Sequence, residues 1–196
     1  MMGPGPTAPR ANGPWHTESW GDGSPNSAGD LTLEEARHAV EAYLQARGLS
    51  HLEVAEVMAF EHNFYAIAQE PDTGFGAMEL LVDRETGAVG PEMGPNMMWN
   101  ARYGMHGRGT IRPGGRQVNA VAPEEAVEIA QRWLDRNRPG ILADEHADTF
   151  YGYYTVHTLQ DGRVEGMLSV HGTTGQVWYH TWHGRFVEMI EHEDIH

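Results

Sequence analysis

The chain has 196 residues, 40% of them hydrophobic, which is enough apolar material for one domain of ordinary size or two small ones. Its 28 acidic residues outnumber its 13 basic residues, and the formal net charge of -15 argues against nucleic acids and anionic membranes as partners. The absence of Cys excludes disulfides, thiolate metal sites and cysteine nucleophiles. No apolar run approaches the roughly 20 residues of a membrane-spanning helix, so we expect no direct membrane insertion.

The N-terminal segment, residues 1–29, combines Gly, Pro, Ser, Asn and Thr with Trp15 and Trp20, and such a composition cannot form a core of its own. We therefore predict an extended arm. Either the two Trp side chains pin the arm onto the folded body, or the segment is a linker to a leader or a membrane anchor. The first ten residues lack the apolar region of a signal peptide, so the chain is either cytosolic or begins after a processed leader.

The first regular elements follow from Asp30 onward. Thr32 and Glu35 have the spacing of a capping box, and apolar residues recur at helical spacing as far as Gly48, which predicts a helix over residues 32–47. The next segments are rich in β-branched and aromatic residues and are separated by turn formers. They predict three antiparallel strands, over residues 52–60, 63–69 and 76–83.

The second half of the chain repeats this order. A helical stripe begins at Pro123 and is stopped by Pro139 and Gly140. The hairpin sequence VDRETGAV, which begins at Val82, recurs 88 residues later as VHGTTGQV, which begins at Val170. The helix positions correspond as well: Glu34, Glu35, Ala36 and Leu44 recur as Glu124, Glu125, Ala126 and Leu134. This pattern predicts a tandem duplication of one helix followed by an antiparallel meander.

A helix that opens with Glu-Glu-Ala, followed by a meander that closes in an Asp-x-x-Thr-Gly-x-Val hairpin, resembles the PepSY family, over about residues 31–93 and 121–183. The resemblance implies an α+β fold of two tandem repeats, each with one helix packed on a three- to four-stranded antiparallel sheet. We expect an arm (1–29), a first repeat with a Met/Trp extension (30–104), a linker (105–120), a second repeat (121–189) and an acidic, His-containing tail (190–196).

PepSY modules occur in the propeptides of thermolysin-like metallopeptidases, where they inhibit and assist folding, and as free-standing secreted or envelope proteins. The resemblance therefore implies a non-catalytic binding module, secreted or exposed in the cell envelope. Its partner would be a protein, such as a peptidase restrained in trans or a membrane complex. His171 in the second repeat replaces Asp83 of the family pattern, which weakens the inhibitor interpretation. No nucleophile motif, zincin helix or phosphate loop is present, so we expect no enzyme activity.

An alternative function is metal handling, because the chain has 12 His and 10 Met but no Cys. Imidazole and thioether are the ligands that a copper site uses in the absence of thiolate. A two-residue turn at Asp161-Gly162 would place Val156, Met167 and His180 side by side on the face that the helix leaves uncovered. In that register His183 and His157 lie together on the opposite face, so at most one of two sets, His180 with Met167 or His183 with His157, can be the site. The alternative is that the uncovered face packs against the other repeat and needs no cofactor.

Two further segments have open interpretations. The aromatic and Met residues on the uncovered strand and in the unrepeated sequence PNMMWN either pack between the repeats or bind a partner: Trp178, Trp182, Met97, Met98 and Trp99. In the tail, His192 and His196 lie at i, i+4, with Glu188 one turn earlier. A helical tail would chelate a divalent ion weakly, whereas a charged terminal segment is otherwise simply solvated.

Overall fold

The computed structural model describes residues 29–105 and 119–191 and shows an α+β fold. The expected arm, most of the expected linker, and His192 and His196 of the tail lie outside these residues. Within them, the helices are α1 (Leu33–Ala46), α2 (Pro95–Met98) and α3 (Pro123–Asn137). The strands are β1 (Glu53–Phe60), β2 (Phe64–Gln69), β3 (Gly76–Val82), β4 (Val89–Pro91), β5 (Leu142–Ala143), β6 (Asp148–Phe150), β7 (Tyr153–Gln160), β8 (Arg163–His171), β9 (Val177–Tyr179) and β10 (Phe186–Glu191). None of the helices in the described ranges is long and apolar enough to cross a membrane.

Helix α1 begins where the sequence predicts. The Thr32 hydroxyl accepts a hydrogen bond from the Glu35 amide, and the Glu35 carboxylate accepts one from the Thr32 amide, which completes a capping box. Helix α3 begins at Pro123. Proline is tolerated there because an amide in the first turn of a helix has no acceptor within the helix, so its absence costs no hydrogen bond. Both helices bury a stripe at helical spacing: Leu33, Ala36, Val40 and Leu44 in α1, and Ala126, Ala130 and Leu134 in α3.

The strands form one sheet in the order β10-β1-β2-β3-β6-β7-β8-β9, with β4 beside β3 and β5 beside β7. The expectation of two separate sheets of three or four strands is therefore wrong. Every pairing is antiparallel except that of β3 with β6, which meet at Gly76 and Phe150. A Cβ atom on Gly76 would lie 2.3 Å from the Phe150 ring, so the absence of a side chain lets the two halves of the sheet join.

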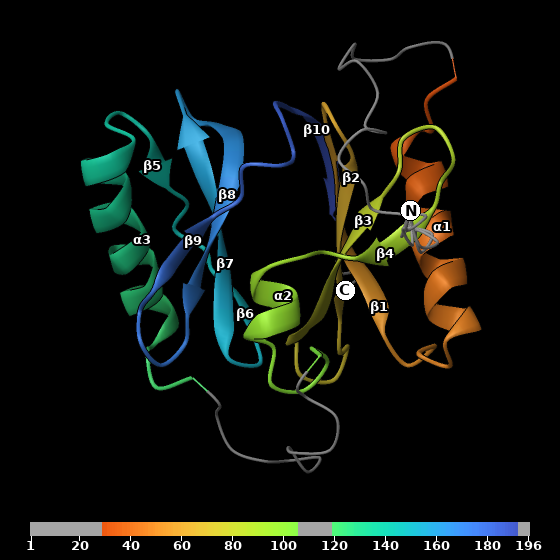
Figure 1. The fold of residues 1–196 in the computed structure, drawn as a ribbon, viewed down its shortest axis with the longest axis horizontal. Helices are drawn as coiled ribbons and strands as arrows, with labels where there is room; N and C mark the ends of the chain where they lie inside the picture. Colours follow the sequence, from red (N-terminus) through yellow and green to blue (C-terminus); the bar gives the residue numbers. More distant parts are fainter. Residues whose placement is uncertain (1–28, 106–118, 192–196) are drawn as a thin grey trace, which may run out of the picture.

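Helices α1 and α3 lie on opposite outer sides of the molecule, and α2 lies near the middle (Figure 1). Between α1 and α3 lie the two halves of the sheet: β1–β4 with β10 form the first half, and β5–β9 form the second. Helix α1 packs on β1–β3, where Leu44 and Val82 are buried, and α3 packs on β7 and β8, where Leu134 and Val170 are buried. The predicted neighbours Tyr43, Val89, Trp133 and Val177 pack at the margins of these two cores. A third core fills the space between the inner faces of the two halves, with Met58 and Tyr65 from one side and Tyr153 and Met167 from the other.

The β7–β8 hairpin corrects the predicted register. Asp161 and Gly162 form the turn as expected, but a bulge at Thr158 and Leu159 moves the pairing by one residue. Val156 therefore packs under α3 and not beside Met167, which pairs with His157 on the inner face. A single extra residue in one strand reverses the face of every side chain beyond it.

The chain crosses from the second half to the first after Tyr179, where β9 ends. Residues 180–185 are irregular, and β10 then pairs antiparallel with β1 of the first half. The helical alternative for the tail does not hold at Glu188, because this residue lies in β10 opposite Ala59. The crossing places the segment from His180 onward between the two halves.

Candidate metal centre

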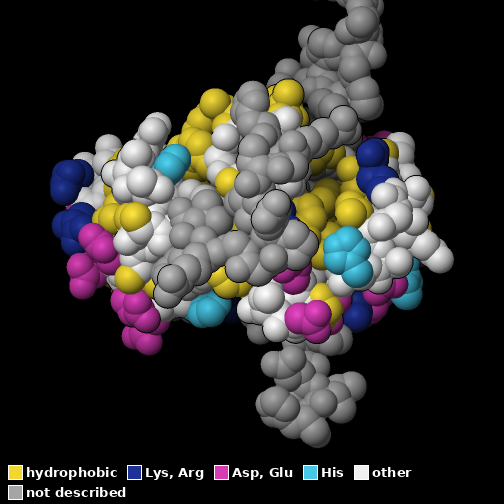
Figure 2. Space-filling model, turned by 90° about the horizontal axis from the view of Figure 1, so that it is seen from below, with side chains coloured by type: hydrophobic (Ala, Val, Ile, Leu, Met, Phe, Trp, Pro, Cys, Tyr) yellow, Lys and Arg dark blue, Asp and Glu magenta, His cyan; other side chains and the backbone are white. Residues whose placement is uncertain are grey.

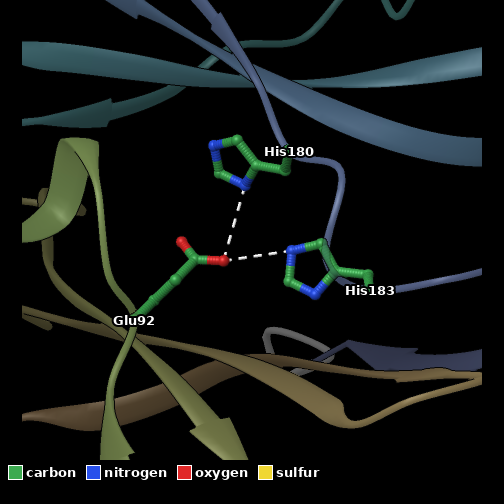
Figure 3. A group of neighbouring side chains, drawn as sticks. All are labelled: Glu92, His180 and His183. Carbon is green, nitrogen blue, oxygen red and sulfur yellow. Dashed lines mark ion pairs between the residues drawn. The ribbon is translucent and has the colours of Figure 1, made fainter. Parts of the chain in front are cut away.

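Three buried side chains meet between the two halves of the sheet: Glu92, His180 and His183 (Figure 3). The Glu92 Oε1 atom lies 3.0 Å from His183 Nε2 and 3.4 Å from His180 Nδ1. One nitrogen or oxygen atom from each residue lies within 4.8 Å of the others. The exposed fractions are 0%, 3% and 2%, so no bulk water competes for these atoms.

The fold supplies these residues from distant parts of the chain. Glu92 follows β4 directly, and its amide donates to the Glu79 carbonyl of β3 at 2.9 Å. Asn96 in α2 holds the same stretch, because its side-chain amide donates to the carbonyls of Glu79 and Glu92. His180 and His183 lie in the irregular segment between β9 and β10. The group therefore joins the first half of the sheet, through Glu92, to the segment that follows the last strand of the second half.

The ring of His183 has a defined orientation. Its Nδ1 atom lies 2.9 Å from Asn63 Oδ1, a carboxamide oxygen that can only accept, so Nδ1 carries the proton. The other ring nitrogen, Nε2, faces Glu92 Oε1 at 3.0 Å. The imidazole also stacks on Phe60 with ring centroids 4.7 Å apart. His183 is therefore held with Nδ1 anchored and Nε2 directed into the group.

The ring of His180 is fixed from three sides. Its Nε2 atom lies 2.9 Å from Ser169 Oγ, its amide donates to the Met167 carbonyl at 3.1 Å, and its ring stacks on Trp182 at 4.7 Å. The indole of Trp182 donates to Glu92 Oε1 at 3.0 Å. The Nδ1 atom of His180 is left facing the carboxylate, as Nε2 of His183 is.

The pKa values of the three side chains are shifted in different directions. Burial alone would raise the pKa of Glu92, but His180 and His183 outweigh burial and lower it well below the ordinary value. Burial would lower the pKa of His180, but Glu92 outweighs burial and raises it. For His183, burial and the charge of His180 together lower the pKa. The shifts thus favour the ionised form of Glu92, strengthen proton binding at His180 and weaken it at His183.

This group leaves polar atoms unsatisfied. Glu92 Oε2, His180 Nδ1 and His183 Nε2 are buried and make no hydrogen bond of good geometry. Buried polar atoms without a partner are rare in native proteins, since each costs about 1–3 kcal/mol. The other ring nitrogens, His180 Nε2 and His183 Nδ1, each have a hydrogen-bond partner. Metal-ligating histidines show this arrangement, with one nitrogen anchored and the other directed at the ion.

A polar network continues from the group into the interior. Ser169 Oγ lies 3.4 Å from Thr155 Oγ1, which donates to the Glu79 carboxylate at 2.6 Å. Tyr65 and Tyr153 also donate to this carboxylate, at 2.7 and 2.8 Å. Burial, and secondly the charge of Glu92, raise the pKa of Glu79 to about 7. Since Tyr153 and Thr155 belong to the second half and Glu79 to the first, the network ties the halves together.

The four predicted ligand residues have different surroundings. His180 and His183 lie together, so the expectation that they occupy opposite faces is wrong: regular strand alternation ends at Tyr179. Met167 is fully buried in the core between the halves. His157 lies instead beside Glu56 of β1, with Nε2 and Oε1 3.3 Å apart. Glu92 was not predicted as a ligand from the sequence. It lies in the stretch near α2 that has no counterpart in the second repeat.

The predicted partner-binding residues divide between interior and surface. Trp182 contacts the candidate ligands Glu92 and His180, and Trp99 contacts Trp178 of the second half, with ring centroids 5.9 Å apart. Met97 is half-buried, whereas Met98 is 58% exposed. Figure 2 shows charged side chains on both flanks of the molecule and hydrophobic side chains visible between them. The aromatic residues thus pack between the halves, and the exposed part of this set is Met98.

Comparisons of the chain with protein-family models, with curated proteins and with solved structures found no match. The chemistry of the centre is therefore inferred from its own geometry.

Proposed function

We propose that the protein is a metal-binding module that holds one divalent transition-metal ion between Glu92, His180 and His183. The convergence of two imidazole nitrogens and a carboxylate oxygen in a buried position carries this proposal. These are the ligand types that bind zinc, copper, nickel and iron in proteins. Three protein ligands leave at least one coordination position for a water molecule or a fourth donor.

A metal ion explains features that a simple ion pair does not. An ion pair between Glu92 and His180 would be strengthened by hydrogen bonds to the remaining buried atoms, yet Glu92 Oε2 and His183 Nε2 lack them. An ion coordinated by these atoms would satisfy them and would add positive charge beside a carboxylate whose pKa is already lowered. Asn63 and Ser169 support this role, because they fix His183 Nδ1 and His180 Nε2.

The ligand set favours a divalent ion. Two nitrogens and one carboxylate oxygen suit Cu²⁺ and Zn²⁺, whereas a cuprous site usually relies on soft sulfur ligands. The order of divalent affinities places Cu²⁺ above Zn²⁺ at a given nitrogen and oxygen site. We therefore propose copper(II) as the tightest ion and zinc(II) as its competitor.

We also propose that the two halves are PepSY-like repeats whose sheets have joined. The two hairpins that carry the resemblance have the same turn, with Gly87 and Gly175 both at a φ of 67°. Asp83 accepts amide hydrogen bonds inside the first turn, and His171 Nδ1 accepts them inside the second. His171 thus performs the structural task of the Asp that it replaces. This likeness supports a non-catalytic module of the secreted or envelope-exposed kind.

Binding of a protein partner is a second candidate function, supported by an exposed hydrophobic surface. Four large hydrophobic side chains are exposed in the described ranges: Met93, Met98, Met105 and Leu142. Three of them are Met residues close to α2, and flexible Met side chains adapt well to partner surfaces. A peptidase restrained in trans is the partner that the PepSY resemblance suggests. Unchanged activity of a thermolysin-like peptidase across a titration with the protein would contradict this candidate.

Calorimetric titration with Cu²⁺ and with Zn²⁺ tests the metal proposal. The protein should be purified without a His tag and dialysed against a chelator, because the chain has 12 His of its own. We expect one tight site per chain, lost in Glu92→Gln and in His183→Gln. His38→Gln is the matched control, because His38 is exposed and contacts only Glu41 within the described residues. Absence of tight binding, or tight binding that persists in both site variants, would overturn the proposal.

A further inference from the structure

The C-terminal strand β10 is attached to the first half without a buried side chain of its own. Its described side chains, from Phe186 to Ile190, are all half-buried or exposed. In contrast, β8 buries five consecutive residues, from Gly166 to Val170. Strand β10 is therefore held by its backbone pairing with β1, over Glu56 to Phe60, and by partly buried side chains at the margins of the cores. Strands with so little buried surface open locally more readily than core strands.

The anchor of β10 is the segment just before it. His183 is buried, its carbonyl accepts from the His62 amide at 2.9 Å, and its ring bonds to Asn63. The Arg185 carbonyl accepts from the Glu61 amide at 2.8 Å, and the two side chains form an exposed ion pair. The contacts that fix residues 182–185 thus lie mainly on the loop between β1 and β2 and on Glu92, in the first half. His180, in contrast, is also held by Ser169 and the Met167 carbonyl of β8.

The metal ligands lie on both sides of this attachment. Glu92 belongs to the body of the first half, whereas His180 and His183 belong to the segment that carries β10. An ion that contacts all three therefore binds only while residues 180–185 are docked. We propose that the metal ion locks β10 onto β1, so that metal loading controls whether the edge of β1 is covered. This inference rests on the metal-binding function proposed above and adds its regulation.

Mass action gives the size of the effect. A ligand that binds only the docked form lowers the population of the undocked form by a factor of 1 + [L]/Kd. At a free metal concentration about 100 times Kd, the undocked population falls about 100-fold. In the undocked form the amides and carbonyls of β1 that face β10 lose their partners. A sheet edge of this kind accepts an extended peptide as an added strand.

Hydrogen exchange measured by mass spectrometry tests this proposal on the full chain. The parent protein is compared in chelator and in Zn²⁺ at about 100 times its measured Kd. We expect the amides of residues 186–191 and of β1 to exchange at least 10-fold more slowly with Zn²⁺, while those of β7 and β8 change little. Glu92→Gln should show no effect of Zn²⁺, and His38→Gln should behave as the parent protein does.

Calorimetry on the same samples separates the two ways in which this can fail. If Zn²⁺ binds but exchange at β10 is unchanged, the lock is wrong and the metal-binding function stands. If protection rises equally in β7, β8 and β10, the ion stabilises the whole fold and the local lock is wrong. If Zn²⁺ and Cu²⁺ do not bind, the proposed function is wrong and the lock falls with it. The comparison of the parent protein with and without metal needs no variant to fold.

Discussion

The pair formed by the half-buried His157 and the buried Glu56 should make the free energy of unfolding fall as pH becomes alkaline. Burial by itself lowers the pKa of His157, but Glu56 outweighs burial and raises it from 6.5 to about 9. A group whose pKa is raised in the folded state stabilises it fully below the unfolded pKa, and this stabilisation is lost as pH rises through the folded pKa. The difference between 6.5 and about 9 corresponds to about 3 kcal/mol in the free energy of unfolding.

Replacing His157 with Gln removes the titrating group and keeps a polar side chain beside Glu56. We expect the variant to be about 3 kcal/mol less stable than the parent protein at pH 6, and equal to it above pH 10. Urea unfolding of both proteins in a chelator at several pH values between 6 and 10 measures this difference. His38→Gln is the control, because His38 is exposed. A difference between parent and His157→Gln that stays constant from pH 6 to pH 10 would refute the reasoning.

Three other substitutions test particular contacts. Asn63→Ala should weaken Zn²⁺ binding about 10- to 100-fold by releasing the ring of His183, and an unchanged calorimetric Kd would contradict this. Gly76→Ala should destabilise the fold by about 1–3 kcal/mol in urea unfolding, because its Cβ would overlap the Phe150 ring; a variant as stable as the parent protein would show that the two halves separate easily. Thr32→Ala should cost about 1 kcal/mol through loss of the capping box, and thermal unfolding without a lowered midpoint would count against that role.

Local signals in the sequence were sufficient where neighbouring residues determine the structure. The capping box at Thr32, Pro123 at the start of α3 and the hairpin glycines each act within a few residues, and each appears in the structure. The apolar stripes of both helices were also predicted, because a helix buries residues at a fixed spacing. The burial of Leu44 and Leu134 follows from this rule.

The joining of the two halves could not be predicted in the same way. The parallel contact of Gly76 with Phe150 and the pairing of β10 with β1 connect residues far apart in the chain. The His192 and His196 spacing suggested a helix, but the neighbouring strand pairing places Glu188 in an extended segment. Tertiary pairing outweighs local spacing in such a case, since the partner strand supplies hydrogen bonds that the local pattern does not show.

The candidate centre was predicted only in part. The two strand-end histidines were considered, but strict alternation was assumed beyond Tyr179, and this separated His180 from His183. The bulge at Thr158 introduced a second error of one residue, which exchanged the predicted faces of Val156 and His157. Glu92 had no motif of its own. The one sequence feature that sets Glu92 apart is that its segment has no counterpart in the second half, so the fold of the repeat does not require that segment.

A crystal structure of the protein grown with Zn²⁺ tests the central claim most directly, through anomalous differences measured at the zinc edge. The account predicts one dominant peak about 2.0–2.2 Å from a Glu92 oxygen, His180 Nδ1 and His183 Nε2, with the ring contacts of both histidines kept. A dominant peak at other histidines, or none while these three side chains keep their positions, would contradict it.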